Sequence, residues 1–180
     1  MSEFSESYHL RGTSRREAVN LLHRAGLSGF VFPALDGWVS LVAEGAAFKP
    51  NQELIRANEG LLMRWVYADD HGWAFDIFKG KKKVVAYECS WEDEVEVNAK
   101  VTLKDLQVAL GVELPALAGE AGARVLYPRS VDEYIEVNPA YTFAAAVGLT
   151  NYRWLAYDYL VRDAERGHDL PPGVQRVGDA

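Results

Sequence analysis

The chain has 180 residues, of which 49% are apolar and 25% charged, with a formal net charge of -7 and one cysteine. This is the composition of an ordinary globular protein that is long enough to form a core. The acidic balance argues against nucleic-acid binding, and a single cysteine excludes an intramolecular disulfide and a cysteine-based metal cluster.

The first 60 residues mix helical and strand patterns. The segment 1–12 has no apolar stretch, so we expect a flexible lead-in and not a signal peptide. Helix-capping residues, period-two alternation and glycines then mark the elements that follow. The predicted elements are a helix from Thr13 or Ser14 to Gly26, strands over 30–32 and 38–43, and a helix from Pro50-Asn51 to about Asn58.

The segment 61–89 is the part of the chain with the clearest pattern, because three runs alternate with period two around turns at 69–72 and 79–81. Such alternation predicts three antiparallel strands, a β-meander. The face that bears Trp65, Phe75 and Val85 should be covered by helices. The opposite face bears Arg64, Asp76 and Glu88, and we expect it to be solvated because burying unpaired charge is costly.

The second half of the chain is predicted to be helical. An acidic connection over 91–97, in which a short edge strand is one possibility, leads to helices from Thr102 onward. The last of these runs from Thr150 or Asn151 to about Arg166, and a tail with adjacent prolines follows. The prediction is an α+β fold: one mainly antiparallel sheet of about five strands in the order α-β-β-α-β-β-β, with helices packed on one face and a helical C-terminal segment. The units are a lead-in over 1–12, a sheet domain over 13–99, a helical segment over 100–166 and a flexible tail over 167–180.

Several short motifs together resemble a known kind of domain. They are Gly37-Trp38-Val39, Leu54, Trp65-Val66-Tyr67, Asp70-His71, Phe75, Val84-Val85, Tyr87 and the stretch FAAAVGLTNYRWLAYDYL from Phe143 to Leu160. The chain is similar to small α+β domains of uncharacterised bacterial proteins, in which a Gly-Trp strand precedes a helix and an aromatic meander. The likeness covers about two thirds of the chain. It implies a fold and a bacterial setting, and it implies no catalytic residues.

The turn Asp69-Asp70-His71-Gly72 holds the densest group of reactive side chains. Asp69, Asp70 and His71 are candidate metal ligands, and His71, Asp70 and Asp76 are candidate catalytic residues, with Glu88 on a neighbouring strand. Against this, ligands of a metal site converge from different segments, whereas adjacent turn residues diverge, and Asp favours turns for backbone reasons.

Two other features suggest function less strongly. The stretch 143–157 has the spacing of a helix-turn-helix, but its second helix is near neutral, so nucleic-acid binding is not expected. Cys89 ends a strand and is expected to be a buried, inert thiol.

The absence of catalytic and phosphate-binding motifs favours a non-catalytic binding or protein-interaction module over an enzyme. We expect a soluble cytoplasmic protein without a cofactor or a membrane segment, since no apolar run reaches the roughly 20 residues of a membrane helix. Its partner would be a protein or a small ligand. One form of the binding-module hypothesis is self-association through a sheet edge or through the acidic segment Glu92 to Glu96. The alternative is a small metal-dependent hydrolase centred on Asp69, Asp70 and His71.

Overall fold

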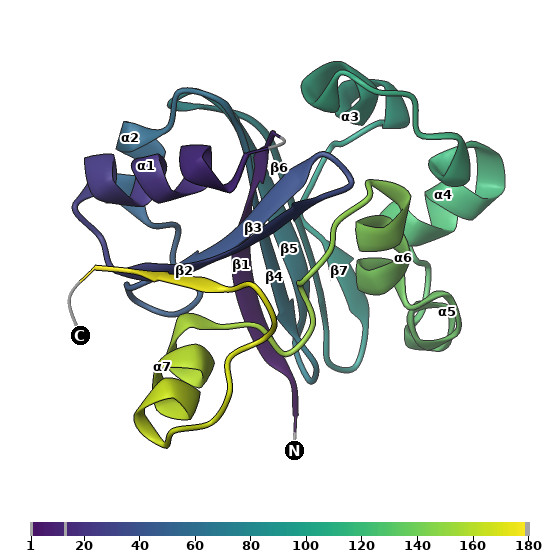
Figure 1. Cartoon of the computed structure of the whole chain (residues 1–180). Helices are drawn as coiled ribbons and strands as arrows, with labels where there is room; N and C mark the ends of the chain where they lie inside the picture. The colour runs from purple at the N-terminus through teal and green to yellow at the C-terminus, as the bar shows by residue number, and fades with distance from the viewer. Residues whose placement is uncertain (1, 13, 179–180) are drawn as a thin grey trace.

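The structure is a computed structural model that describes residues 2–12 and 14–178 (Figure 1). Within these residues the protein is α+β, with one antiparallel sheet of eight strands in the order β7-β6-β5-β4-β1-β3-β2-β8. In this part of the chain, no helix is both long and apolar enough to cross a membrane. The strands are β1 Phe4–Arg11, β2 Gly29–Leu35, β3 Trp38–Ala43, β4 Leu61–Ala68, β5 Gly72–Lys79, β6 Lys82–Trp91, β7 Val95–Val97 and β8 Gln175–Val177.

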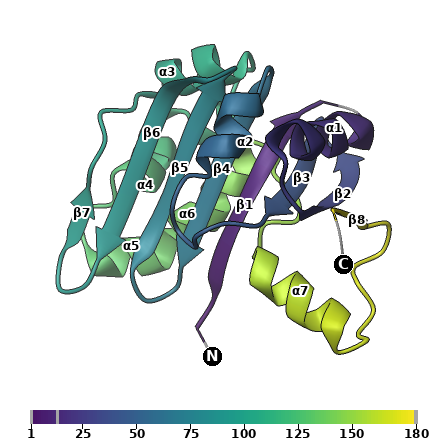
Figure 2. The same ribbon diagram turned by 90° about the vertical axis from the view of Figure 1, so that its left-hand side faces the viewer.

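Helices lie against both faces of the sheet (Figures 1 and 2). The helices α1 and α2 cover one face near β1 and β3, while α3 to α6 cover the opposite face of the meander. The helices are α1 Arg15–Ala25, α2 Gln52–Ala57, α3 Leu103–Leu110, the short 3-10 helix Pro115–Leu117, α4 Gly119–Leu126, α5 Val131–Val137, α6 Pro139–Ala146 and α7 Tyr157–Glu165.

The predicted meander is confirmed as β4, β5 and β6, each paired antiparallel with the next. Trp65, Phe75 and Val85 are buried together under α3 to α6, as the period-two pattern predicts. The helices were expected on one face only, and this is wrong. Tyr8 and Leu41 point to the other face and pack with α1 and α2, because the strands at this end of the sheet are buried on both faces.

The predicted number of strands is also wrong, because two segments expected to be flexible contain strands and the acidic connection contains a third, β7. Residues 4–11 of the supposed lead-in form β1, which lies between β3 and β4 in the middle of the sheet. In the supposed tail, β8 pairs with β2 at one end of the sheet. The last helix begins at Tyr157, well after the predicted Thr150 or Asn151, and Thr13 lies outside the described residues.

A row of buried polar groups explains why β1 can occupy the centre of the sheet. Ser7, His9 and Ser40 are fully buried, and the segment that precedes α7 crosses over them. The Ser40 hydroxyl donates to the Thr150 carbonyl oxygen (2.6 Å), so it accepts from His9 Nδ1 (3.0 Å), while Ser7 Oγ lies 2.9 Å from His9 Nε2. This pattern assigns the neutral tautomer protonated at Nδ1. The polar face of β1 is therefore satisfied without water.

We expect His9 to make the fold sensitive to mild acid. Burial lowers the pKa of His9 from 6.5 to about 3, so between these values the unfolded chain binds a proton that the folded chain does not. Neutral His9 therefore leaves the free energy of unfolding unaffected above pH 6.5. As the pH falls below 6.5, this free energy decreases, by roughly 2–3 kcal/mol at about pH 4.5. Urea unfolding across this range measures it. His23 is exposed, so His23→Gln should show the same dependence of the free energy of unfolding on pH as the wild type. If His9→Gln also shows that dependence unchanged, the assignment to His9 is wrong.

Candidate functional site

The three residues of the predicted turn site are exposed on the connection between β4 and β5. Each of the three contacts a different residue, and these contacts do not direct the three side chains toward a common point. Asp69 Oδ1 accepts from the Tyr67 hydroxyl (3.0 Å), Asp70 Oδ2 accepts from the Ser2 hydroxyl (2.5 Å), and the His71 ring lies 6.5 Å from the Phe4 ring, centroid to centroid.

Residues 2–12 and 14–178 contain no group of three or more His, Cys, Asp or Glu side chains that could hold a metal ion. Asp76 and Glu88 lie on the sheet face, where Asp76 is bound by cationic side chains. Cys89 is fully buried, and burial raises the pKa of its thiol to about 11, which opposes formation of a thiolate. The catalytic role of the turn remains a prediction, and the geometry directs attention to the adjacent sheet face.

A hollow of about 510 Å³ lies on the meander face opposite α3 to α6. Figure 2 shows that β5 and β6 extend beyond the cover of α1 and α2 on this face. The hollow forms because short side chains on neighbouring strands point to this face and leave a depression in the sheet surface. Its lining includes the small residues Val66, Ala74 and Ala86, the rings of Phe4, Phe48 and His71, and the charged side chains of Arg64, Asp76, Lys83 and Glu88.

A ladder of four charged side chains runs across the strands beside this hollow. Arg64 Nε donates to Glu6 Oε1 (2.8 Å), Arg64 Nη1 lies 3.5 Å from Asp76 Oδ2, and Lys83 Nζ lies 2.8 Å from Asp76 Oδ1. Arg64 is only 5% exposed and Asp76 only 7% exposed. The prediction that both would be solvated is therefore wrong, because pairing across the strands removes the penalty of an unpaired buried charge. Glu88 is exposed as predicted.

A second hollow of about 140 Å³ adjoins the first, between β1, the loop 45–49 and the start of α7. Phe4 and Phe48 line both hollows, and their rings meet edge to face at 6.1 Å. We call the two hollows together the divided groove. The smaller lobe is further lined by Glu6, Tyr8, Ala43, Gly45, Ala46, Ala47, Lys49, Asn51, Ala156, Tyr157, Asp158 and Tyr159.

The backbone of Phe48 is strained. Its φ is +60°, a left-handed conformation that a bulky residue rarely adopts. The Phe48 N–H donates to Glu6 Oε2 at 2.6 Å, which links the loop to the charged ladder, and the ring remains 44% exposed. Backbone strain of this kind persists only where surrounding contacts enforce it, and it concentrates at functional sites.

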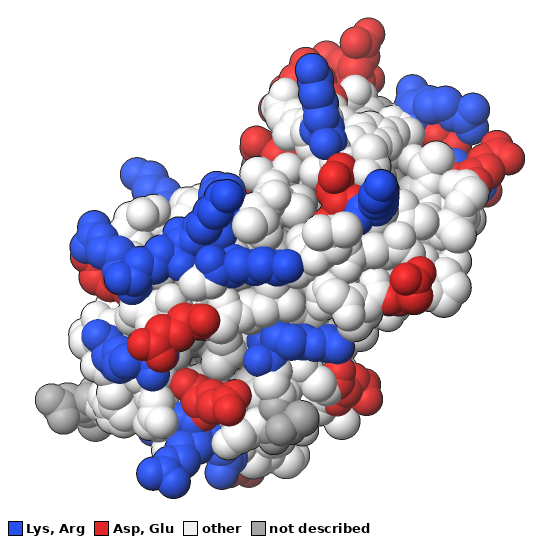
Figure 3. Space-filling view, turned by 90° about the horizontal axis from the view of Figure 1, so that it is seen from above, with Lys and Arg blue, Asp and Glu red and all other residues white. Residues whose placement is uncertain are grey.

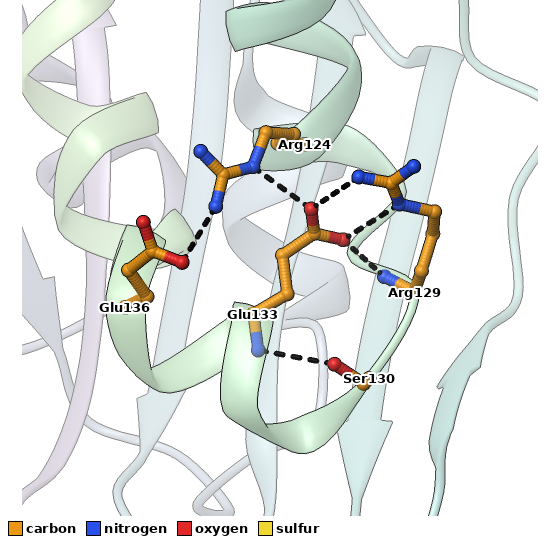
Figure 4. A network of polar contacts seen from close by, with 5 residues as sticks. All are labelled: Arg124, Arg129, Ser130, Glu133 and Glu136. Atoms are coloured by element: carbon orange, nitrogen blue, oxygen red, sulfur yellow. Dashed lines mark hydrogen bonds and ion pairs between the residues drawn. The ribbon is translucent and has the colours of Figure 1, made fainter.

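A further charged network lies away from the groove and joins α4 to α5 (Figure 4). Arg124 and Arg129 both donate to the Glu133 carboxylate, and the hydrogen bonds from Arg129 are the main cause that lowers the pKa of Glu133 to about 2. The Ser130 hydroxyl oxygen accepts from the Glu133 N–H (3.2 Å), as a helix cap does. The carboxylate is fully occupied, so this network has a structural role.

Sequence reasoning missed most of the divided groove. Phe4 and Glu6 lie in the supposed lead-in, and Phe48 lies between the predicted strand over 38–43 and the predicted helix that begins at Pro50. The one available signal was a large aromatic residue within a run of small ones, Gly45-Ala46-Ala47-Phe48.

A scan of protein-family models, a search of curated proteins and a search of solved structures each give no significant match. Function must therefore be inferred from the residues themselves.

Proposed function

We propose that the protein is a non-catalytic binding module that holds a small, partly apolar ligand in the divided groove. The observation that carries this proposal is Phe48, a half-exposed aromatic residue in a strained conformation at the boundary of two hollows. An exposed ring gains free energy when a ligand covers it, and that gain offsets the cost of holding the strained backbone.

The chemistry of the lining supports a ligand with one flat apolar part and one polar part. Phe4 and Phe48 offer ring surfaces to the apolar part. The side chain of Lys83 is 45% exposed, and its ammonium group, which pairs with Asp76 at 2.8 Å, has further N–H donors to offer on the side of the larger lobe. Mostly apolar lining with a few fixed polar groups is the usual character of small-molecule sites.

Saturation-transfer NMR with a library of small aromatic fragments tests this proposal. We expect some fragments to receive saturation from the wild-type protein, and Ala46→Trp, which fills the smaller lobe, should weaken their binding by about tenfold or more. Ala118→Trp places the same ring on an exposed residue outside the groove and should leave binding unchanged. If no fragment binds, or if both variants behave alike, the groove is not a ligand site.

A further inference from the structure

The outer edge of β6 is largely open, which makes it a second candidate surface, separate from the divided groove. β7 pairs only with Cys89–Trp91 at the end of β6, and the Asn98 N–H then donates to the Glu88 carbonyl oxygen (2.8 Å). Over 82–87, β6 pairs with β5 on one side and, in the described parts of the chain, with no strand on the other.

The direction of the free backbone groups follows from this contact. The Glu88 carbonyl points away from β5, and alternate residues of a regular antiparallel strand point their N–H and C=O groups the same way. No bulge interrupts the pairing of Ala86 to Glu88 with β5. The N–H and C=O of Ala86 therefore also point outward, where an added strand would meet them.

A hollow of about 610 Å³ lies between this edge and α3. Three lysines from three separate elements surround it: Lys79 on β5, Lys100 on the connection after β7, and Lys104 on α3. The only carboxylate of its lining within the described residues, Asp105, already accepts hydrogen bonds from Thr102 as a helix cap. Figure 3 shows this end of the molecule from above, with Lys and Arg side chains among Asp and Glu side chains. The hollow is thus locally cationic in a protein whose net charge is -7.

Exposed apolar side chains border the same hollow. Val84 is 38% exposed and Val108 is 65% exposed, so both present apolar surface beside the strand edge. Backbone groups that can extend a sheet, apolar side chains beside them and a rim of one charge are the features of peptide recognition by strand addition.

We propose that an extended acidic segment of a protein partner binds here as an added strand on β6. Its backbone would pair with Ala86, its alternate apolar side chains would cover Val84 and Val108, and its carboxylates would face Lys79, Lys100 and Lys104. The lysines select the partner, because they repel basic strands and discourage uncharged ones from pairing with the open edge.

Fluorescence anisotropy with labelled synthetic peptides tests this proposal. The probes are acetyl-EVEVEVE-amide, its lysine counterpart acetyl-KVKVKVK-amide and its neutral counterpart acetyl-QVQVQVQ-amide. We expect only the acidic peptide to bind appreciably, with an affinity that falls as salt is added. Binding of the basic or the neutral peptide with equal affinity would overturn the proposal.

Two variants separate strand addition from simple charge attraction. Ala86→Pro removes an outward N–H that the fold does not use, so it should weaken acidic-peptide binding by about tenfold or more while the circular dichroism spectrum stays unchanged. Lys104→Glu should weaken binding similarly, whereas Lys49→Glu, an equal charge change in the divided groove, should not. Full binding by folded Ala86→Pro would exclude strand addition.

Two further outcomes would replace the partner. If sedimentation shows a concentration-dependent dimer that Ala86→Pro abolishes, the occupant is a second copy of this chain and not another protein. If a single-stranded oligonucleotide binds with the same dependence on Lys104, the lysines recognise phosphate. Ala86 also lines the larger lobe of the divided groove, whereas Lys104 lies outside both of its lobes. Fragment binding by Lys104→Glu should therefore match the wild type, so this proposal and the proposed function can fail independently.

Discussion

Replacing Phe75 with alanine is expected to lower the free energy of unfolding by about 3–5 kcal/mol. Phe75 is fully buried, and its ring stacks on Phe143 of α6 at 4.3 Å and on Tyr87 of β6 at 5.0 Å between centroids. The substitution therefore leaves a cavity between the sheet and its helical layer, where neighbours can collapse only partly. Urea unfolding followed by tryptophan fluorescence measures the loss.

The control for this prediction is Leu35→Ala. Leu35 is also apolar and lies in a strand, but it is 53% exposed, so the change should stay within about 0.5 kcal/mol. A Phe75→Ala loss no larger than that of Leu35→Ala would mean that the meander face under α3 to α6 is not the main core.

The meander could be predicted because its information is local. Each of its strands alternates between a face that packs on helices and a face with smaller or charged residues, and Gly72 and Gly80 permit the tight turns. Nothing distant in the chain is needed to recognise that pattern. The predicted strands at 61–68 and 73–78 agree with β4 and, to within one residue at each end, with β5.

β1 could not be recognised in the same way, because what stabilises it lies far along the chain. Its serines and His9 look like surface residues, and they become buried only because the segment after α6 supplies hydrogen-bond partners such as the Thr150 carbonyl. A strand with one polar face reads as exposed until the covering segment is known. The mixed apolar pattern of 38–43, in contrast, was a readable sign that both faces of that strand are buried.

The candidate site depends on distance in the same manner. Phe4 and Phe48 belong to segments about forty residues apart in the sequence, and they meet only when β1 enters the sheet. The sequence singled out Asp76 as a candidate residue but not its partners. Arg64 lies opposite Asp76 because of the register between β4 and β5, and Glu6 reaches Arg64 only because the unrecognised β1 enters the sheet. Residue type alone therefore suggested solvated charge where the structure has a buried ladder.

Replacing Arg64 with methionine is the second change from which we expect a large effect, a loss of about 3–5 kcal/mol. Arg64 is the only side chain that joins Glu6 to Asp76 in the ladder of the described residues, and its removal leaves Glu6 without its cation. Asp76→Ala should cost less, because Arg64 keeps Glu6 as a partner at 2.8 Å.

A double-mutant cycle shows whether the loss comes from the unpaired carboxylate. If it does, Glu6→Gln in the Arg64→Met background should recover part of the stability, although Glu6→Gln alone destabilises the wild type. The expected coupling is about 1–3 kcal/mol, read from urea unfolding of the four proteins. Strict additivity would show that Arg64 acts through the packing of its aliphatic stem and not through its charge.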